Sequence, residues 1–177
     1  MYRKSFKAIR KICAFGAGFS LATMFAIIFI NSVRRYTLGK SFEWGEELPI
    51  YLGIYGLMFG AAFAYLDDQH IRFTIVIDRL SEKLKNRIFV VVDILVAITG
   101  VALAYSGYLF MIRRGKVEAS GLIGPVRRAA EDLSMSWIEL FGHMAFWQFS
   151  MLLGGILIAI AACYKIPSRL NPKEAAS

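Results

Sequence analysis

The sequence predicts an all-α integral membrane protein with four transmembrane helices, an interfacial amphipathic helix and both termini in the cytoplasm. Hydrophobic residues make up 57% of its 177 positions, and the mean hydropathy is +0.53, well above the average for soluble proteins. The 21 basic and 13 acidic residues must lie mostly outside the apolar stretches, because a charge at the bilayer centre costs at least ~2.5 kcal/mol. This composition excludes a soluble enzyme and a disordered chain.

Four stretches of the chain are long and apolar enough to cross a bilayer. Three of them contain no charged residue, and the third along the chain contains only Asp93, which we expect near the membrane surface. An α-helix rises ~1.5 Å per residue, so about 20 apolar residues cross a hydrocarbon core of ~30 Å. We therefore expect residues 1–177 to form a single membrane domain. The predicted spans are residues 12–33, 48–66, 88–112 and 144–164.

The distribution of basic residues predicts the orientation. If the N-terminus is cytoplasmic, the cytoplasmic segments carry 13 of the 21 basic residues and the external segments carry 8, as the positive-inside rule favours. Basic residues also precede the first span, as they do in a signal peptide. That span is too long for the apolar part of a cleaved signal peptide, and no small-residue cleavage pattern follows it. We expect an uncleaved signal anchor.

The connection between the first and second spans places charges at both helix ends. Arg35 and the arginine before it complement the negative end of the first helix, while Glu46 and Glu47 complement the positive end of the second. Together with Glu43 these glutamates have helical spacing, and Arg35 is a candidate partner for them. Trp44 suits an interfacial aromatic belt. Two interpretations remain open: dipole complementation at the membrane surface, or a contact surface for another membrane subunit.

Small residues recur every fourth position in the last three spans. Gly56 and Gly60 in the second span allow another helix backbone to approach closely. Gly100 and Gly155, each followed four residues later by alanine, repeat the pattern in the third and fourth spans. The pattern predicts tight helix packing but does not identify the neighbouring helix.

The second connection predicts an amphipathic helix over residues 71–87 that lies in the membrane interface. Its apolar residues fall at helical spacing from Phe73 onward, and its basic excess suits the anionic lipids of the inner leaflet. His70 precedes this segment after two aspartates. A single histidine beside carboxylates favours a structural hydrogen bond over a role as a ligand.

No residue pattern predicts catalysis, a cofactor or a metal. The two histidines, His70 and His143, fall on opposite sides of the membrane in this topology, which excludes a pair of axial haem ligands. Cys13 and Cys163 are far apart in sequence, and we expect free thiols with packing roles. The chain contains no phosphate-binding loop, nucleophile motif or zinc spacing, and its basic residues form no nucleic-acid patch. We expect no enzyme activity, no cofactor and no nucleic-acid partner.

The spans also lack the features of a helix bundle that carries a solute itself. Such transporters usually contain repeated halves, broken helices and ionisable groups at mid-depth, and none is evident here. Three classes of protein remain: a subunit of a larger membrane complex, a homo-oligomeric channel or exporter, and a membrane anchor of a redox or signalling enzyme.

Five sequence elements between residues 25 and 80 resemble the small four-helix membrane subunit (Q-type) of tripartite ATP-independent periplasmic (TRAP) transporters. Their order and spacing both match that family. The C-terminal half is similar only in hydropathy, because residues 113–143 form a long polar connection and the fourth span lacks a proline. The five elements are Asn31-Ser32-Val33-Arg34-Arg35-Tyr36, Ser41 with Trp44-Gly45-Glu46-Glu47, Gly60-Ala61-Ala62, His70-Ile71, and Asp78.

The resemblance implies the small subunit of a sodium-coupled, binding-protein-dependent secondary transporter in the bacterial inner membrane. Its solute would be an organic acid of the sialic acid or C4-dicarboxylate class. This subunit would brace the scaffold of a large membrane subunit, while a periplasmic substrate-binding protein binds transiently and lipids surround the complex. The candidate residues for contact with the large subunit, or for a structural junction, are Arg35, Trp44, Glu46, Glu47, Gly56, Gly60 and His70.

Overall fold

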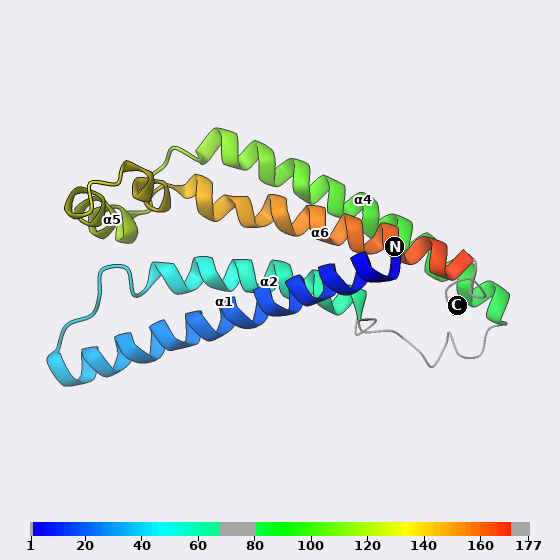
Figure 1. The fold of residues 1–177 in the computed structure, drawn as a ribbon, viewed down its shortest axis with the longest axis horizontal. Coiled ribbons are helices and arrows are strands. Elements are labelled where there is room, and N and C mark those ends of the chain that lie inside the picture. Colours follow the sequence, from blue (N-terminus) through cyan, green and yellow to red (C-terminus); the bar gives the residue numbers. More distant parts are fainter. Residues whose placement is uncertain (1, 68–80, 171–177) are drawn as a thin grey trace.

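The computed structural model describes residues 2–67 and 81–170, and its long helices form two antiparallel hairpins (Figure 1). In the first hairpin α1 packs on α2, and in the second α4 packs on α6. The hairpins meet where α2 contacts α6, so the helices form a row in the order α1, α2, α6, α4. The long helices are α1 (Tyr2–Leu38), α2 (Glu47–Leu66), α4 (Glu82–Arg114) and α6 (Met144–Leu170).

The expectation of four transmembrane helices is confirmed. Each predicted span lies within one long helix, and each helix is long and apolar enough to cross a membrane. The helices continue beyond the apolar runs, since α1 begins at Tyr2 and α4 at Glu82. An α-helix satisfies its own backbone hydrogen bonds, so it continues into the polar headgroup region until a residue breaks it.

The predicted interfacial helix over residues 71–87 lies largely outside the described residues. Where its last residues are described, from Glu82, they form the first turns of α4 and not a separate helix. The last residues of the predicted interfacial helix thus belong to α4, and the predicted span 88–112 lies within it. The extended backbone of Ser81 precedes the helix, and no glycine or proline separates Glu82 from the apolar run. One continuous helix therefore costs less than a break.

Backbones touch between α4 and α6. A Cβ atom placed on Gly155 would lie 2.7 Å from the carbonyl oxygen of Gly100, and one on Gly100 would lie 2.7 Å from the backbone nitrogen of Ala159. Gly107 lies equally close to the backbone of Leu152 on α6. Small residues are required here because lipid offers no hydrophobic drive between helices, so close van der Waals contact must hold them together. The small-residue pattern of the third and fourth spans thus joins these two helices to each other.

A buried charged cluster joins three helices at the end of the row away from α5. The carboxylate of Asp93 in α4 is 1% exposed. It accepts a hydrogen bond from the Tyr65 hydroxyl of α2. It also forms an ion pair with Arg169 of α6, whose Nε lies 2.5 Å from Asp93 Oδ2. The Arg169 guanidinium also lies over the ring of Phe89, 4.6 Å from its centroid. Asp93 therefore lies inside the helix bundle, where these partners replace water, and its expected depth near the membrane surface stays a prediction.

We predict that Gly155→Ala lowers the stability of the chain by about 1–3 kcal/mol, because the added methyl group meets backbone atoms that cannot move aside cheaply. Gly18→Ala is the matched control, since a Cβ at Gly18 of α1 meets nothing within 4 Å. The control should change stability by less than ~1 kcal/mol. Thermal unfolding of the purified chain in detergent, followed by circular dichroism, measures both, and equal melting of the two variants would contradict the α4–α6 packing.

Candidate subunit contact site at the α5 end

The connection after α1 is held against that helix by two local contacts. Helix α1 ends at Leu38 because Gly39 takes a left-handed backbone conformation, with φ of 66°, and its N–H donates to the carbonyl of Arg35. Three residues further on, the N–H of Phe42 donates to the Asn31 side chain at 2.8 Å. A Cβ at Gly45 would lie 2.6 Å from the same amide group. The Asn31 amide therefore fixes the connection that leads into α2.

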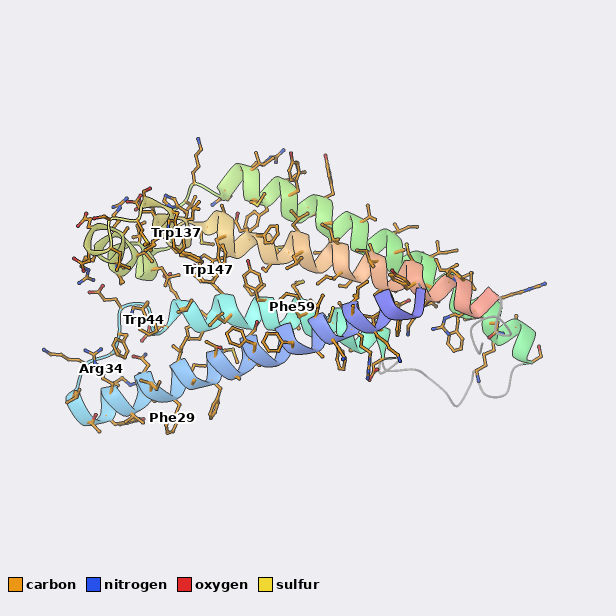
Figure 2. All side chains as sticks on the ribbon, in the orientation of Figure 1. Phe29, Arg34, Trp44, Phe59, Trp137 and Trp147 are labelled. Carbon is orange, nitrogen blue, oxygen red and sulfur yellow. The ribbon has the colours of Figure 1, made fainter. Side chains whose placement is uncertain are left out.

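Trp44 anchors this connection in a small apolar core. Its ring stacks on Phe42 with centroids 4.9 Å apart, and it packs against the buried residues Ala119, Leu122 and Trp147. Trp147 of α6 in turn stacks on Tyr51 of α2, with centroids 5.0 Å apart. Figure 2 shows Trp44, Trp137 and Trp147 gathered at this end of the molecule. The interfacial tryptophan of the sequence analysis thus packs between the helices of this chain.

Helix α5 (Ser120–Asp132) and the 3-10 helix η1 (Ser136–Gly142) lie over this end of the row (Figure 1). The Ser120 hydroxyl donates to Glu47 Oε1 at 2.6 Å, and Arg128 donates to Glu43 Oε2 at 2.8 Å. A Cβ at Gly121 would lie 2.8 Å from the Glu43 carbonyl oxygen. Glu43, just before α2, and Glu47, its first residue, therefore both bind α5.

Residues 113–143 are expected from the sequence to form a polar connection, whereas the structure contains α5 there. A detectable signal was present, because Leu122, Val126 and Ala130 recur at helical spacing. Leu122 and Ala130 are buried, and Val126 packs beside the core that contains Leu122. Pro125, the sixth residue of the helix, hides the pattern, because a proline inside a helix removes one backbone hydrogen bond.

Arg35 and Glu46 lie on another side of the connection. Both line a hollow of about 290 Å³ that also includes Asn31 and Gly45. Within residues 2–67 and 81–170, Arg35 forms no ion pair, and its guanidinium lies 5.6 Å from the ring centroid of Tyr36. The expected ion pair of Arg35 with the glutamates is therefore not found among these residues. Glu43 forms an ion pair with Arg128 on α5 instead.

The other candidate residues are not brought to this site. Gly56 packs against α1, where an added Cβ would lie 3.1 Å from the Leu21 side chain. Gly60 faces the same helix more loosely, since its Cβ would lie 3.9 Å from that of Ala17. In this chain the glycines of α2 therefore face a helix of the same chain. His70 lies outside the described residues.

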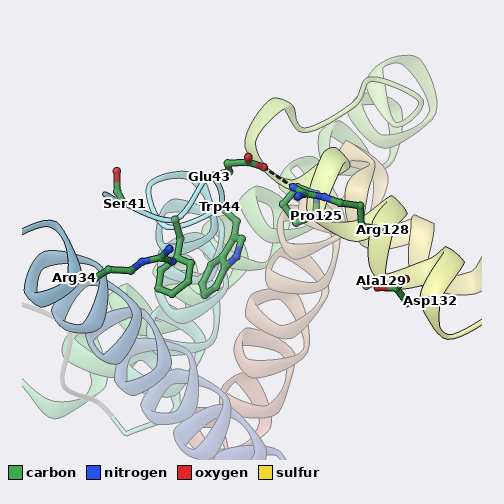
Figure 3. Close-up of a pocket in the computed structure, with 9 residues that line it drawn as sticks. Arg34, Ser41, Glu43, Trp44, Pro125, Arg128, Ala129 and Asp132 are labelled. Carbon is green, nitrogen blue, oxygen red and sulfur yellow. Dashed lines mark hydrogen bonds and ion pairs between the residues drawn. The ribbon is translucent and has the colours of Figure 1, made fainter. Parts of the chain in front are cut away.

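A pocket of about 460 Å³ opens between the connection after α1 and helix α5 (Figure 3). The Glu43–Arg128 ion pair crosses its middle, and Arg34 and Asp132 lie on opposite sides. The guanidinium carbon of Arg34 lies 3.9 Å from the Phe42 ring centroid. The lining residues are Arg34, Ser41, Phe42, Glu43, Trp44, Pro125, Arg128, Ala129 and Asp132.

The described part of the chain shows no arrangement for catalysis or metal binding. Among these residues no group of three or more histidine, cysteine, aspartate or glutamate side chains is placed to hold a metal ion. Cys13 is buried, Cys163 is exposed, and both are free thiols. The arrangement at the α5 end can bind charged groups of a partner, but it presents no activated nucleophile.

Comparison with known proteins gives matches over most of the chain. Residues 24–171 match the family model of the DctQ component of tripartite ATP-independent periplasmic transporters. Two relatives from Haemophilus influenzae carry the provisional name TRAP transporter small permease protein. One is 26% identical over 110 residues, which cover 62% of this chain and 67% of the relative. The other is 33% identical over 60 residues, which cover 34% of this chain and 37% of the relative.

We predict that Gly121→Ala releases α5 from the start of α2, because the added methyl group would press on the Glu43 backbone. Gly124→Ala is the control within the same helix, since its Cβ would meet only side-chain atoms, at 3.9 Å or more. An overpacking cost of about 1–3 kcal/mol should speed tryptic cleavage after Arg127 and Arg128 by at least about fivefold. Limited proteolysis of the purified chain in detergent measures this rate. If the two variants are cleaved at the same rate, the close contact of α5 with the Glu43 backbone is wrong.

Proposed function

The chain belongs to the DctQ component family of tripartite ATP-independent periplasmic transporters, and we propose that it braces the scaffold of a large membrane subunit that carries the solute. As a member of this family it is a multi-pass protein of the bacterial inner membrane and a transporter subunit, not an enzyme. The identification made from the five sequence elements is thereby confirmed. The bracing role, the solute class and the coupling ion are proposals.

The observation that supports a bracing role is the row of helices without a buried charged group in its middle, within the described residues. Among the described residues the buried charged side chains are Asp93 and Lys165. Asp93 is neutralised by Arg169, and Lys165 lies over the Tyr65 ring, 4.9 Å from its centroid. The middle of the described bundle therefore offers no charged group for an organic anion. A bundle without such a site is suited to support and not to transport.

The outer helices of the row present wide apolar faces. On α1 the phenylalanine side chains from Phe15 onward face outward, as Phe29 does in Figure 2. Lipid and the large subunit would share these faces, because contiguous exposed apolar surface of this extent marks a membrane or protein contact. The exposed side chains include Phe15, Phe19, Phe25 and Phe29 on α1, and Val91, Leu95, Ile98 and Val101 on α4.

The proposed solute is an organic acid of the sialic acid or C4-dicarboxylate class, taken up with sodium and delivered by a periplasmic substrate-binding protein. Family membership supports this proposal, and the absence of a charged mid-bundle site in the described residues agrees with it. The residues that would select the solute and the ions belong to the other subunits. The two alternative functions are a homo-oligomeric channel or exporter and an anchor for a redox or signalling enzyme. No observation favours either of them.

The proposed orientation has the α5 end outside the cytoplasm and the Asp93 end at the cytoplasmic side. The basic-residue count supports this orientation, because 13 of the 21 basic residues lie in the segments assigned to the cytoplasmic side and 8 lie in the others.

We predict that sodium-dependent uptake of the organic acid requires this chain together with the large subunit and the binding protein. Proteoliposomes that lack this chain should take up the labelled acid at the background rate, and replacing external sodium by potassium should have the same effect. Liposomes that contain this chain alone should neither conduct ions nor transport the acid. Conduction by the chain alone would favour a channel, and co-purification of a soluble enzyme would favour an anchor.

The orientation is tested by cysteine labelling. Ser41 and Ser81 are both exposed and lie at opposite ends of the row. In a variant without Cys13 and Cys163, we expect an impermeant thiol reagent added to spheroplasts to label Ser41→Cys but not Ser81→Cys. Permeabilised cells provide the control, because both positions should then react. The reverse pattern would put the α5 end in the cytoplasm.

A further inference from the structure

A hollow at the end of the first hairpin, separate from the pocket beside α5, holds two opposite charges that do not pair. It measures about 290 Å³ and lies between the last turns of α1 and the start of α2. Arg35 and Glu46 both line it, and neither side chain forms an ion pair within residues 2–67 and 81–170. The other lining residues are Ile28, Asn31, Ser32, Gly45, Pro49 and Ile50.

The depth of this hollow in the membrane follows from the residues that line it. Ile28 and Ile50 belong to the two apolar runs of the hairpin. Arg35 follows the first run and Glu46 precedes the second, each two positions outside it. A helix rises ~1.5 Å per residue, so Arg35 lies about 3 Å beyond its apolar run, within the polar layer of the bilayer. The hollow therefore has a charged rim at headgroup level and an apolar wall at the level of the acyl chains.

The apolar wall of the hollow is open to the bilayer. The Ile28 side chain is 45% exposed and that of Ile50 is 62% exposed. The back of the hollow is closed, because Gly45 and Pro49 are buried. The Gly45 backbone lies so close to Asn31 that an added Cβ would be 2.6 Å from the amide group. A lipid beside α1 and α2 can thus place its headgroup in the hollow while its acyl chains remain outside.

Helix-end electrostatics explain why these two charges are present but not how they are arranged. Arg35 lies in the last turn of α1 and Glu46 is the N-cap residue of α2, so each complements a helix dipole. Opposite charges at neighbouring helix ends would gain further by pairing directly, yet no such pair forms among the described residues. The hollow lies between them instead and leaves room for a group that carries both charges.

The two charges select the chemistry of the occupant. The Arg35 guanidinium can bind a phosphate through two parallel hydrogen bonds, and the Glu46 carboxylate can accept hydrogen bonds from a primary ammonium group. A free organic dianion or an anionic lipid headgroup would satisfy Arg35 but would be repelled by Glu46. A choline headgroup has no N–H to donate, and proteins recognise quaternary ammonium groups with aromatic side chains. A phosphoethanolamine headgroup matches both charges.

We propose that this hollow binds one molecule of phosphatidylethanolamine, with its phosphate on Arg35 and its ammonium beside Glu46. The acyl chains then follow Ile28 and Ile50 along α1 and α2 into the bilayer. The lipid links the end of α1 to the start of α2 and neutralises both charges, in place of a direct ion pair. The proposal requires only that the chain spans a bilayer, so it does not depend on the orientation, the solute or the bracing role.

Native mass spectrometry of the delipidated chain in detergent tests the proposal, because it counts bound lipids and measures their affinity. Phosphatidylethanolamine, phosphatidylcholine and phosphatidylglycerol with identical acyl chains are titrated separately. We expect one phosphatidylethanolamine per chain to bind at least about fivefold more tightly than the other two, since it alone satisfies both charges. Water-soluble phosphoethanolamine at equal concentration should not displace it. Displacement would identify a free headgroup as the ligand and overturn the proposal.

Two charge reversals separate binding in this hollow from unspecific attraction to the chain. Arg35→Glu should weaken binding of phosphatidylethanolamine at least about tenfold, because the phosphate loses its partner. Glu46→Lys should reverse the preference, so that phosphatidylglycerol binds more tightly than phosphatidylethanolamine, and a folding defect cannot produce such a gain. The matched controls are Lys40→Glu in the same connection and Glu131→Lys in α5. Both residues are exposed and outside the hollow, so the lipid preference should not change.

Equal binding of phosphatidylethanolamine by Arg35→Glu and Lys40→Glu would overturn the proposal. Equal binding of phosphatidylethanolamine and phosphatidylglycerol by the unmodified chain would do so as well. The remaining candidate occupant is a pair of charged side chains of the large subunit. If the complex with that subunit retains no phosphatidylethanolamine and Arg35→Glu prevents its assembly, the two charges bind protein and the proposal is wrong.

Discussion

The backbone contact between α4 and α6 is the interaction on which the rest of the arrangement depends. Among the long helices, α4 packs chiefly on α6, so its place in the row is set by the close approach at Gly100 and Gly155. That approach closes the second hairpin and thereby determines where α5 and η1, which join its two helices, must lie. Helix α5 then reaches Glu43 and Glu47. The contact between α4 and α6 in the middle of the bundle therefore positions the candidate site at the α5 end.

Hydropathy predicts the row of helices but not its order. The apolar runs predict all four spans because lipid leaves a helix as the available way to satisfy the backbone of such a segment. The neighbours of each helix depend on shape, and the same small-residue spacing occurs in α2, α4 and α6. In α4 and α6 it brings backbones into contact, whereas at Gly60 it leaves ordinary packing distance. The difference arises from three-dimensional fit, which no local pattern contains.

The charged residues show the same limit. The sequence identifies Asp93 as the one charge within an apolar run, but its partners Tyr65 and Arg169 lie in other helices and are distant in sequence. At the other end, helix-end arguments single out Glu47, whose partner Ser120 belongs to a helix that the sequence pattern does not predict. The type of a residue and its distance from a helix end are local properties that the sequence contains. The interaction partners of a charged residue depend instead on the order in which the helices pack.

The two ends of the row differ in how firmly they are held. At the Asp93 end a buried ion pair joins α4 to α6, and removing one partner of such a pair typically costs about 3–5 kcal/mol, because the other charge stays buried. At the α5 end the Glu43–Arg128 pair has side chains 67% and 66% exposed, and exposed pairs contribute only about 0–1 kcal/mol. α5 is held mainly by its apolar face and by the fit at Gly121, so its charged groups can exchange partners at little cost. The chain is therefore firmly paired at one end of the row and exchangeable at the other.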